Sequence, residues 1–296
     1  MAEESFVKSQ LAAFCKALNK VEAPLKQKHV RALVVGTHKL RSSRIFWHSV
    51  SRIQLEKNPV LTWKFCQLLH KLIHDGHRKI TEESVGHVSR LNQLGNFWQH
   101  LRSSGYGQAN TCYCKLLVSR LQFHKKYPSI PGNLNLNQRQ LDTLCSDINE
   151  TYELAIDMLD QMDELLNLKA TKTLFSLVMS IMDSMRWSSL VPQGQCLLAP
   201  LILVILDTSK FYDFLVKAHF KLHKSYCKLL VSRLQFHKKY PSIPGNLNLN
   251  QRQLDTLCSD INETYELAID MLDQMDELLN LKATRFYLKC KLGIFY

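Results

Sequence analysis

The sequence predicts an all-α protein made of stacked, antiparallel helices. Apolar residues recur three and four positions apart in several segments, which is the spacing of one helix face. Proline and glycine stand where those segments begin and end, as they do at helix boundaries. No segment alternates apolar and polar residues with the period of a strand. With 296 residues, 46% of them hydrophobic, the chain is long enough to bury a sizeable core.

The first two helices are expected near the N-terminus. In residues 11–18, LAAFCKAL, an apolar stripe predicts a helix that buries Leu11, Phe14, Cys15 and Leu18. In residues 24–38, PLKQKHVRALVVGTH, Pro24 predicts a second helix with the proline in its first turn, where a missing N–H leaves no helix bond unmade.

Two longer helices follow. Pro59 and Gly76 are start and stop signals for a helix between them, with one buried face made of Leu61, Phe65, Leu68 and Leu72. An acidic helix is expected over residues 148–166, with a buried stripe made of Ile148, Tyr152, Ala155, Leu159, Met162 and Leu166.

Loops are expected at residues 127–137, which contain two prolines, and at residues 193–200, which lead into a buried helix. The apolar run 197–206 has ten residues and contains Pro200. Because roughly 20 residues are needed to span a bilayer, this run predicts a core helix and not a membrane span.

The second half of the chain contains a repeat. Residues 113–171 recur letter for letter at 226–284. Natural repeats diverge as each copy adapts to its neighbours, so identity at every surface position indicates a recent duplication or a duplicated exon. We therefore divide the chain at residue 224, and predict that residues 225–296 are not a native part of the fold or are loosely attached to residues 1–224.

Charge narrows the function classes. The formal net charge is +12, so anionic partners are favoured: nucleic acid, acidic lipid or acidic protein. The start of the chain is polar and lacks the apolar region of a secretory signal. Nine scattered cysteines fit a reduced, cytosolic protein best.

A basic cluster lies in residues 16–29, KALNKVEAPLKQKH. Lys26, Lys28 and His29 fall in the first turns of the expected second helix, where the helix dipole is already positive. Lys16, on the preceding helix, could reach the same place. Such a set favours a bound anion, because helix N-termini bind phosphates. A solvated basic face is the alternative.

Other constellations predict no chemistry. His70, His74 and His77 lack the glutamate of the zinc-protease motif, and His70 is expected in the core or a groove. Cys112 and Cys114 have no matching second pair and are expected to be structural thiols. The carboxylates of residues 147–164 are expected on an exposed helix face. We expect no enzyme, no metal and no cofactor.

Several motifs resemble a known family. Lys16, nine residues, then Lys26-x-Lys28-His29 resembles the phosphoinositide motif of ANTH domains, K-x9-K-x-K-H. KQKHVRALVVGTH, VLTWKFCQLLHKLIHDGH, GYGQ, PGNLNL and QGQCLLAPLILVILDTSKFYDFLVKAHFKLH resemble one branch of it, the huntingtin-interacting proteins and their yeast and invertebrate relatives. The resemblance spans roughly residues 5–223.

The resemblance implies a superhelical stack of helices and a peripheral adaptor in clathrin-mediated endocytosis, cytoplasmic and located at the plasma membrane, coated pits and vesicles. It implies that phosphatidylinositol bisphosphate is held by Lys16, Lys26, Lys28 and His29. From their charge near an anionic surface, we expect an auxiliary basic surface made of the outlying Lys8, Lys20, Arg31 and Lys39. The family also links the clathrin coat to actin. The sequence departs from the family at Lys224, and the coiled-coil and actin-binding modules are not expected here.

Two alternatives stay open: a basic helical scaffold without lipid preference, and a nucleic-acid binder. The second would need stacking or base-reading side chains among its lysines. Residues 16–29 contain no arginine and no phenylalanine, tyrosine or tryptophan.

Overall fold

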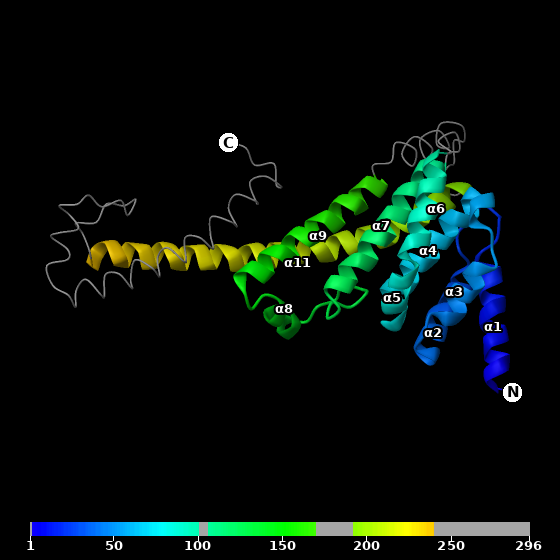
Figure 1. Ribbon diagram of the computed structural model, residues 1–296, viewed down its shortest axis with the longest axis horizontal. Coiled ribbons are helices and arrows are strands. Elements are labelled where there is room, and N and C mark those ends of the chain that lie inside the picture. The colour runs from blue at the N-terminus through cyan, green and yellow to red at the C-terminus, as the bar shows by residue number, and fades with distance from the viewer. Residues whose placement is uncertain (1, 101–105, 170–191, 240–296) are drawn as a thin grey trace. The chain divides into compact units, whose positions relative to one another are not determined.

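The computed structural model describes residues 2–100, 106–169 and 192–239, and within them it contains α-helices and short 3-10 helices but no strand (Figure 1). The chain divides into two compact units. The first comprises Met1–Gln138 and Ile156–Asp213, and the second comprises Arg139–Ala155 and Phe214–Tyr296. The prediction of an all-α fold is confirmed.

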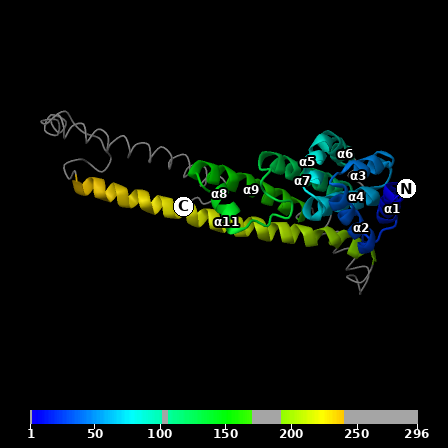
Figure 2. The ribbon, with the colours of Figure 1, turned by 90° about the horizontal axis from the view of Figure 1, so that it is seen from below.

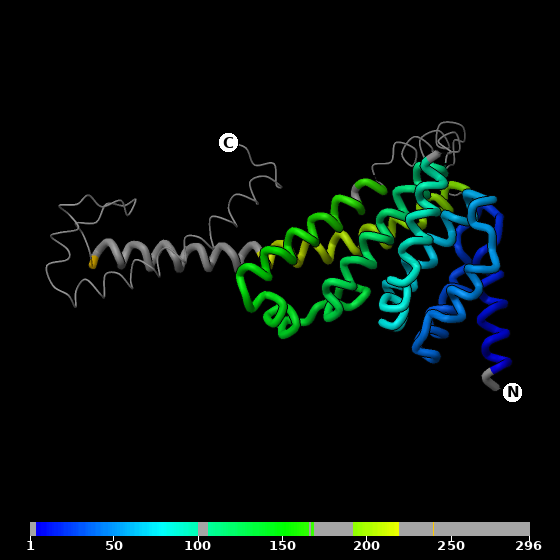
Figure 3. The backbone as a smooth tube through the Cα atoms, in the orientation of Figure 1, coloured from blue at the N-terminus to red at the C-terminus, as the bar shows by residue number. Residues whose placement is uncertain are grey.

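The N-terminal part of the first unit is a stack of helices, as Figures 2 and 3 also show. α1 packs on α2 and α3, α2 packs on α4, and α4, α5 and α6 all pack on α7. Their bounds are α1 Ala2–Ala17, α2 Gln27–Leu40, α3 Arg44–Ser51, α4 Pro59–Asp75, α5 Lys79–Ser84, α6 Val88–His100 and α7 Gly107–Lys126. The 3-10 helices are η1 Leu55–Lys57 and η2 Val85–His87.

The predicted first stripe is correct in part. Phe14 and Leu18 are buried, at 2% and 6% exposed. Cys15 is exposed, so its assignment to the core was wrong. The buried face of α1 contains Ala13 and Ala17 in place of Cys15. It also includes Gln10, whose side-chain amide donates to the Ala32 carbonyl on α2.

The start of α2 was also predicted wrongly. The helix begins at Gln27, with Lys26 as N-cap in extended conformation, so Pro24 precedes the helix. Leu25 and Val30 are both buried, at 4% and 3% exposed. These are the two positions of a hydrophobic staple around an N-cap, which fixes where the chain enters the helix. Burial of Leu25 therefore decided the boundary.

The prediction for α4 is confirmed at both ends. Pro59 occupies its first turn, the Asn58 side chain caps it by accepting from Leu61 N, and Gly76 follows its last residue. The whole predicted stripe is buried. The predicted loop at 127–137 is also confirmed, since no helix lies between α7 and α8, Gln138–Leu144.

Residues 193–200, predicted as a loop, are helical, because α11 runs over Pro192–Lys239. Pro200 lies inside it and cannot donate to the carbonyl of Cys196, four residues earlier. Trp63, which is fully buried on α4, donates its Nε1–H to that carbonyl at 3.0 Å. The bond that proline removes is thus replaced by a side chain, and the helix continues.

The predicted core helix of residues 197–206 is buried on one face only. Leu197, Leu203 and Val204 are buried, whereas Ile202 and Ile205 are exposed. By length and composition alone, one helical stretch in the described part of the chain, Pro192–Ala218, could cross a membrane, with 44% of its most apolar window buried.

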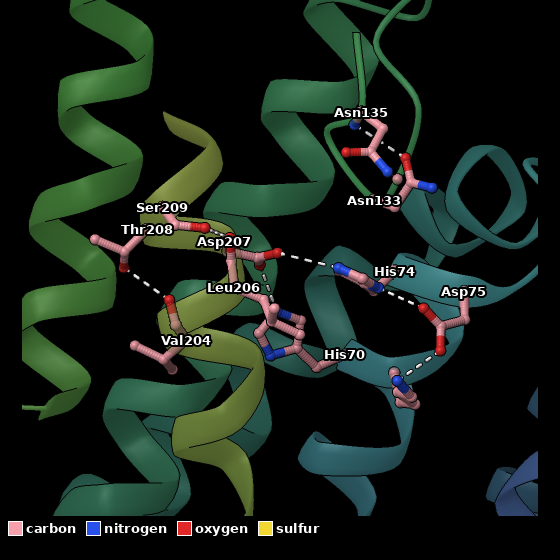
Figure 4. A network of polar contacts seen from close by, with 12 residues as sticks. His70, His74, Asp75, Asn133, Asn135, Val204, Leu206, Asp207, Thr208 and Ser209 are labelled. Atoms are coloured by element: carbon pink, nitrogen blue, oxygen red, sulfur yellow. Dashed lines mark hydrogen bonds and ion pairs between the residues drawn. The ribbon is translucent and has the colours of Figure 1, made fainter. Parts of the chain in front are cut away.

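A buried polar network joins α11 to α4, where Figure 4 shows Asp207 directed towards His70 and His74, and to α7 through Arg120. Asp207 Oδ2 accepts from His70 Nε2 at 2.9 Å and from the Arg120 guanidinium at 3.1 Å. Burial raises the pKa of Asp207, but Arg120 and His70 favour its charge and lower the pKa to about 2. His70 also contacts the Tyr113 hydroxyl at 3.1 Å. The expectation of a core histidine is confirmed.

The acidic helix is α9, Ile148–Lys169. Ala155 is buried as predicted, but most of the buried stripe lies one position before the predicted one. Ile148 is 40% exposed. The apolar residues of α9 span a wide arc, so their spacing alone did not select the inner face. The buried residues are Thr151, Leu154, Ala155, Met158, Gln161, Leu165 and Leu168.

The acidic face of α9 is exposed as predicted, with two exceptions, Asp157 and Glu164. Asp157 is half-buried and accepts from Lys126 Nζ at 2.6 Å and from the Tyr127 hydroxyl at 2.5 Å. In the second unit, Asp147 caps the start of the same helix by accepting from Asn149 N at 2.7 Å.

Cys66 and Cys114 are buried with their sulfur atoms 3.8 Å apart, and both are free thiols, as is Cys112. Cys112 and Cys114 were predicted to be structural thiols, and the burial of Cys114 is consistent with that prediction.

The prediction that residues 225–296 are non-native or loosely attached falls largely outside the described residues, which end at 239. The backbone of residues 226–239 continues α11. The prediction about the second copy therefore stays a prediction.

Candidate functional site

The basic cluster of residues 16–29 lies where α1 ends and α2 begins. Lys16 is in the last turn of α1, Lys26 is the N-cap of α2, and Lys28 and His29 lie in its first turn. The connecting residues fold back, so that three lysine charges act on the His29 ring. The structure thus brings together all four residues that the sequence singled out.

The electrostatics of the cluster are those of like charges held close together. The pKa of His29 lies below its ordinary value, first because the fold partly desolvates the ring and then because like charges oppose its protonation. Those charges belong, in order of effect, to Lys28, Lys16 and Lys26. A bound polyanion would reverse the repulsion and favour the charged ring.

The start of α2 adds hydrogen-bond donors to these charges. The N-cap Lys26 makes no side-chain capping bond. The N–H of His29 already donates to the Lys26 carbonyl at 2.9 Å, but the N–H groups of Gln27 and Lys28 precede the first bond of the helix, and no capping side chain competes for them. Free N–H groups at the positive end of a helix bind phosphate well. The arrangement can therefore hold a ligand that carries several phosphate oxygens.

Residues 18–26 are held in place by Lys64 on α4. This side chain is 1% exposed, and its Nζ donates to Asn19 Oδ1 at 2.8 Å and to the Val21 carbonyl at 3.2 Å. Burial lowers the pKa of Lys64, and Lys26 adds repulsion. Lys64 thus fixes, from the protein core, the connection between Lys16 on α1 and Lys26 at the start of α2.

The single carboxylate within residues 16–29 is directed away from the lysines. Glu22 Oε1 accepts from the Tyr106 hydroxyl at 2.6 Å. Burial and this carboxylate raise the pKa of Tyr106 well above its usual range. Because Glu22 is engaged with Tyr106 at the start of α7, it forms no ion pair with Lys16, Lys26 or Lys28 among the contacts of the described residues.

The four auxiliary residues separate into two groups. Lys20 is exposed in the connection, and Arg31 is exposed one turn beyond Lys28. Lys8 pairs with Glu4 at 3.0 Å, and Lys39 Nζ lies 5.3 Å from the centre of the Phe6 ring. With a rise of 1.5 Å per residue, Lys39 is about 16 Å along α2 from Lys28. Only Lys20 and Arg31 therefore extend the cluster.

Sequence reasoning missed Lys64 and its partner Asn19. One signal could have drawn attention to Lys64: it is the only charged residue in the apolar stretch VLTWKFCQLL. A buried lysine needs a polar partner, but nothing in the sequence indicates that the partner lies 45 residues earlier.

The sequence of the chain matches the model of a known protein family. The sequence model of the ANTH domain matches residues 9–226 and, separately, residues 220–291. The second match falls on the repeated segment.

Among curated proteins, the chain is 59% identical over 222 residues to Huntington interacting protein related 1 of Caenorhabditis elegans, covering 75% of this chain and 23% of that protein. It is 41% identical over 236 residues to human Huntingtin-interacting protein 1, covering 79% of this chain and 22% of that protein. The chain thus spans less than a quarter of the length of either relative. A more distant relative is the Endocytosis protein end4 of Schizosaccharomyces pombe, 26% identical over 212 residues, covering 70% of this chain and 18% of that protein.

Solved structures show the same fold at low identity. The ENTH domain from epsin-2 in complex with phosphatidylinositol 4,5-bisphosphate aligns with a TM-score of 0.63 at 19% identity, covering 100% of this chain and 98% of that one. The endocytic adaptor complex AENTH aligns with a TM-score of 0.62 at 20% identity, covering 96% of each chain.

Proposed function

Because this chain belongs to the ANTH domain family, we propose that it is an endocytic adaptor module that binds phosphoinositide membranes through its basic cluster. Lys16, Lys26, Lys28 and His29 hold the headgroup of a phosphatidylinositol bisphosphate. The observation that carries this proposal is the convergence of three lysine charges on His29 at an uncapped helix start.

The relatives support the cellular setting. One of them is named for endocytosis, and a structure with the same fold was solved with phosphatidylinositol 4,5-bisphosphate. The proposed location is the cytoplasmic face of the plasma membrane, at clathrin-coated pits and vesicles. A link to clathrin and actin is proposed on family resemblance alone, since the chain spans less than a quarter of its two most similar relatives named above. The proposed role is binding without catalysis or cofactor.

The strength of such binding follows from the charges. Each lysine or arginine close to an anionic membrane contributes about 1 kcal/mol. A handful of cations therefore gives reversible, salt-sensitive recruitment, and lasting residence needs further contacts or several modules acting together.

The experiment that tests the proposal is co-sedimentation of the full chain with two sets of vesicles. One set contains a few per cent phosphatidylinositol bisphosphate, and the other carries the same total charge as phosphatidylserine. We expect clear binding to the first and much weaker binding to the second, because only the bisphosphate places clustered phosphates at the start of α2. Equal binding to both sets would reduce the site to a nonspecific basic face, and binding to neither would refute the proposal.

The lowered pKa of His29 predicts a pH dependence of this binding. In the free protein the ring is neutral near pH 7, because its pKa is below the ordinary value of about 6.5. The bound phosphates raise that pKa, so the complex takes up a proton and binding gains as the pH falls from about 7.5 to about 6.

The phosphates also titrate in this range, so the wild type must be compared with a His29→Gln variant. We expect the ratio of wild-type to variant affinity for bisphosphate vesicles to rise several-fold between those two pH values. A ratio that stays constant would show that His29 does not protonate on binding.

A further inference from the structure

Val21 is an exposed apolar side chain in the middle of the basic cluster. It is 64% exposed. The other two large apolar side chains of the connection, Leu18 and Leu25, are only 6% and 4% exposed. The connection therefore buries an apolar side chain on each side of Val21, while the Val21 side chain itself points to solvent.

The backbone of Val21 is fixed in this orientation. Its N–H donates to Asn19 Oδ1 at 3.2 Å. Its carbonyl accepts from Ala23 N at 2.9 Å and from the buried Lys64 Nζ at 3.2 Å. Since both polar groups of the residue are bonded within the fold, the exposure of its side chain comes from a defined turn.

Single exposed apolar residues are common on protein surfaces and need no explanation by themselves. What distinguishes Val21 is its surroundings. Lys20 precedes it, Lys16 lies in the last turn of α1 just before the connection, Lys26 ends the connection, and all three are exposed. Lysines around an apolar side chain match the order of groups at a membrane surface, where anionic headgroups lie above the acyl chains.

We propose that Val21 enters the boundary between headgroups and acyl chains when a bisphosphate headgroup occupies the basic cluster. The inference rests on the proposed function and adds a second contact with the same membrane. The partner is a lipid surface: the lysines take the phosphates, and Val21 takes the apolar layer beneath them. Lys64 acts as a positioning residue, because it ties the Val21 carbonyl to α4.

The test separates the headgroup from the bilayer. In the full chain, Val21→Thr keeps the shape and charge of the side chain but replaces a methyl group by a hydroxyl. We expect this variant to bind bisphosphate vesicles about fivefold more weakly, as expected for one lost methyl group and one partly desolvated hydroxyl. We expect its affinity for soluble inositol trisphosphate, measured by calorimetry, to equal that of the wild type.

The matched control is Val35→Thr, the same change at a valine on α2 that is 44% exposed. It should bind both probes as the wild type does. A Val21→Trp variant reports insertion directly, since its fluorescence should be quenched by brominated acyl chains beyond the level of the wild type, which serves as the blank. That quenching should require bisphosphate in the vesicles.

The outcomes are distinct. If the wild type binds bisphosphate vesicles while Val21→Thr binds them equally well, or while Val21→Trp is not quenched, the insertion is refuted and the proposed function stands. If Val21→Thr also loses soluble headgroup binding, Val21 shapes the cluster instead of entering the bilayer, which likewise refutes insertion. If the wild type binds neither probe, both proposals fail.

Discussion

Asp207→Asn is expected to lower the free energy of unfolding of the chain by about 3–5 kcal/mol, the usual cost of leaving a buried charge without its partner. Arg120 and Asp207 are 2% and 1% exposed, and Arg120 Nη2 lies 3.1 Å from Asp207 Oδ2. The asparagine keeps the shape and can still bond His70, so the loss measures the missing charge. Urea unfolding followed by tryptophan fluorescence gives the value.

The control for this prediction removes both charges. Arg120→Met combined with Asp207→Asn should cost less than Asp207→Asn alone, because no uncompensated ion then stays in the core. A single variant that loses less than about 1 kcal/mol would mean that water reaches Arg120 and that the network is not closed, since a solvent-exposed pair contributes only that much.

The same network gives the wild type a defined acid sensitivity. The folded-state pKa of Asp207 is about 2, and the unfolded value is about 3.9. The carboxylate therefore contributes stability that is present above the unfolded pKa and is lost as the pH falls towards 2. Asp207→Asn should lose less stability than the wild type over that interval.

Lys26→Glu combined with Lys28→Glu is expected to abolish binding to bisphosphate vesicles. The change replaces two positive charges by two negative ones, four units in all. At about 1 kcal/mol for each unit near an anionic surface, affinity falls roughly a thousandfold. Both side chains are exposed and neither makes a capping hydrogen bond to the helix, so the thermal unfolding temperature should stay close to that of the wild type.

The matched control is Lys115→Glu combined with Lys125→Glu. It makes the same change in net charge at two exposed positions on α7. If vesicle binding depends on the cluster, this control keeps most of the wild-type affinity. If both double variants weaken binding equally, affinity follows total charge and the assignment of the headgroup site is incorrect.

Much of the fold could be predicted because its signals are local. Pro59 and Gly76 mark the ends of α4, and each lies directly at the helix boundary that it sets. The spacing of Lys16, Lys26, Lys28 and His29 is likewise a property of one short stretch, and the structure brings these residues together.

The errors occurred where a boundary or a face depended on distant residues. α2 begins three residues beyond Pro24, because Leu25 is buried in the core before the chain enters the helix. Residues 193–200 are helical although they contain a proline, because Trp63, 133 residues away from Cys196, supplies the missing donor. The inner face of α9 was misjudged because its apolar arc is wider than the face that the fold buries.

Local patterns in the sequence established that the protein is helical, that its N-terminal region is basic, and that three lysines and a histidine have the spacing of a phosphoinositide-binding motif. The groups that support this motif became visible only in the folded chain: Lys64 bonds the connection, Tyr106 holds Glu22 away from the lysines, and Val21 is directed outward. Helical periodicity and local charge depend on neighbours in the chain. A hydrogen bond between buried groups depends on packing, which brings together residues that the sequence keeps far apart.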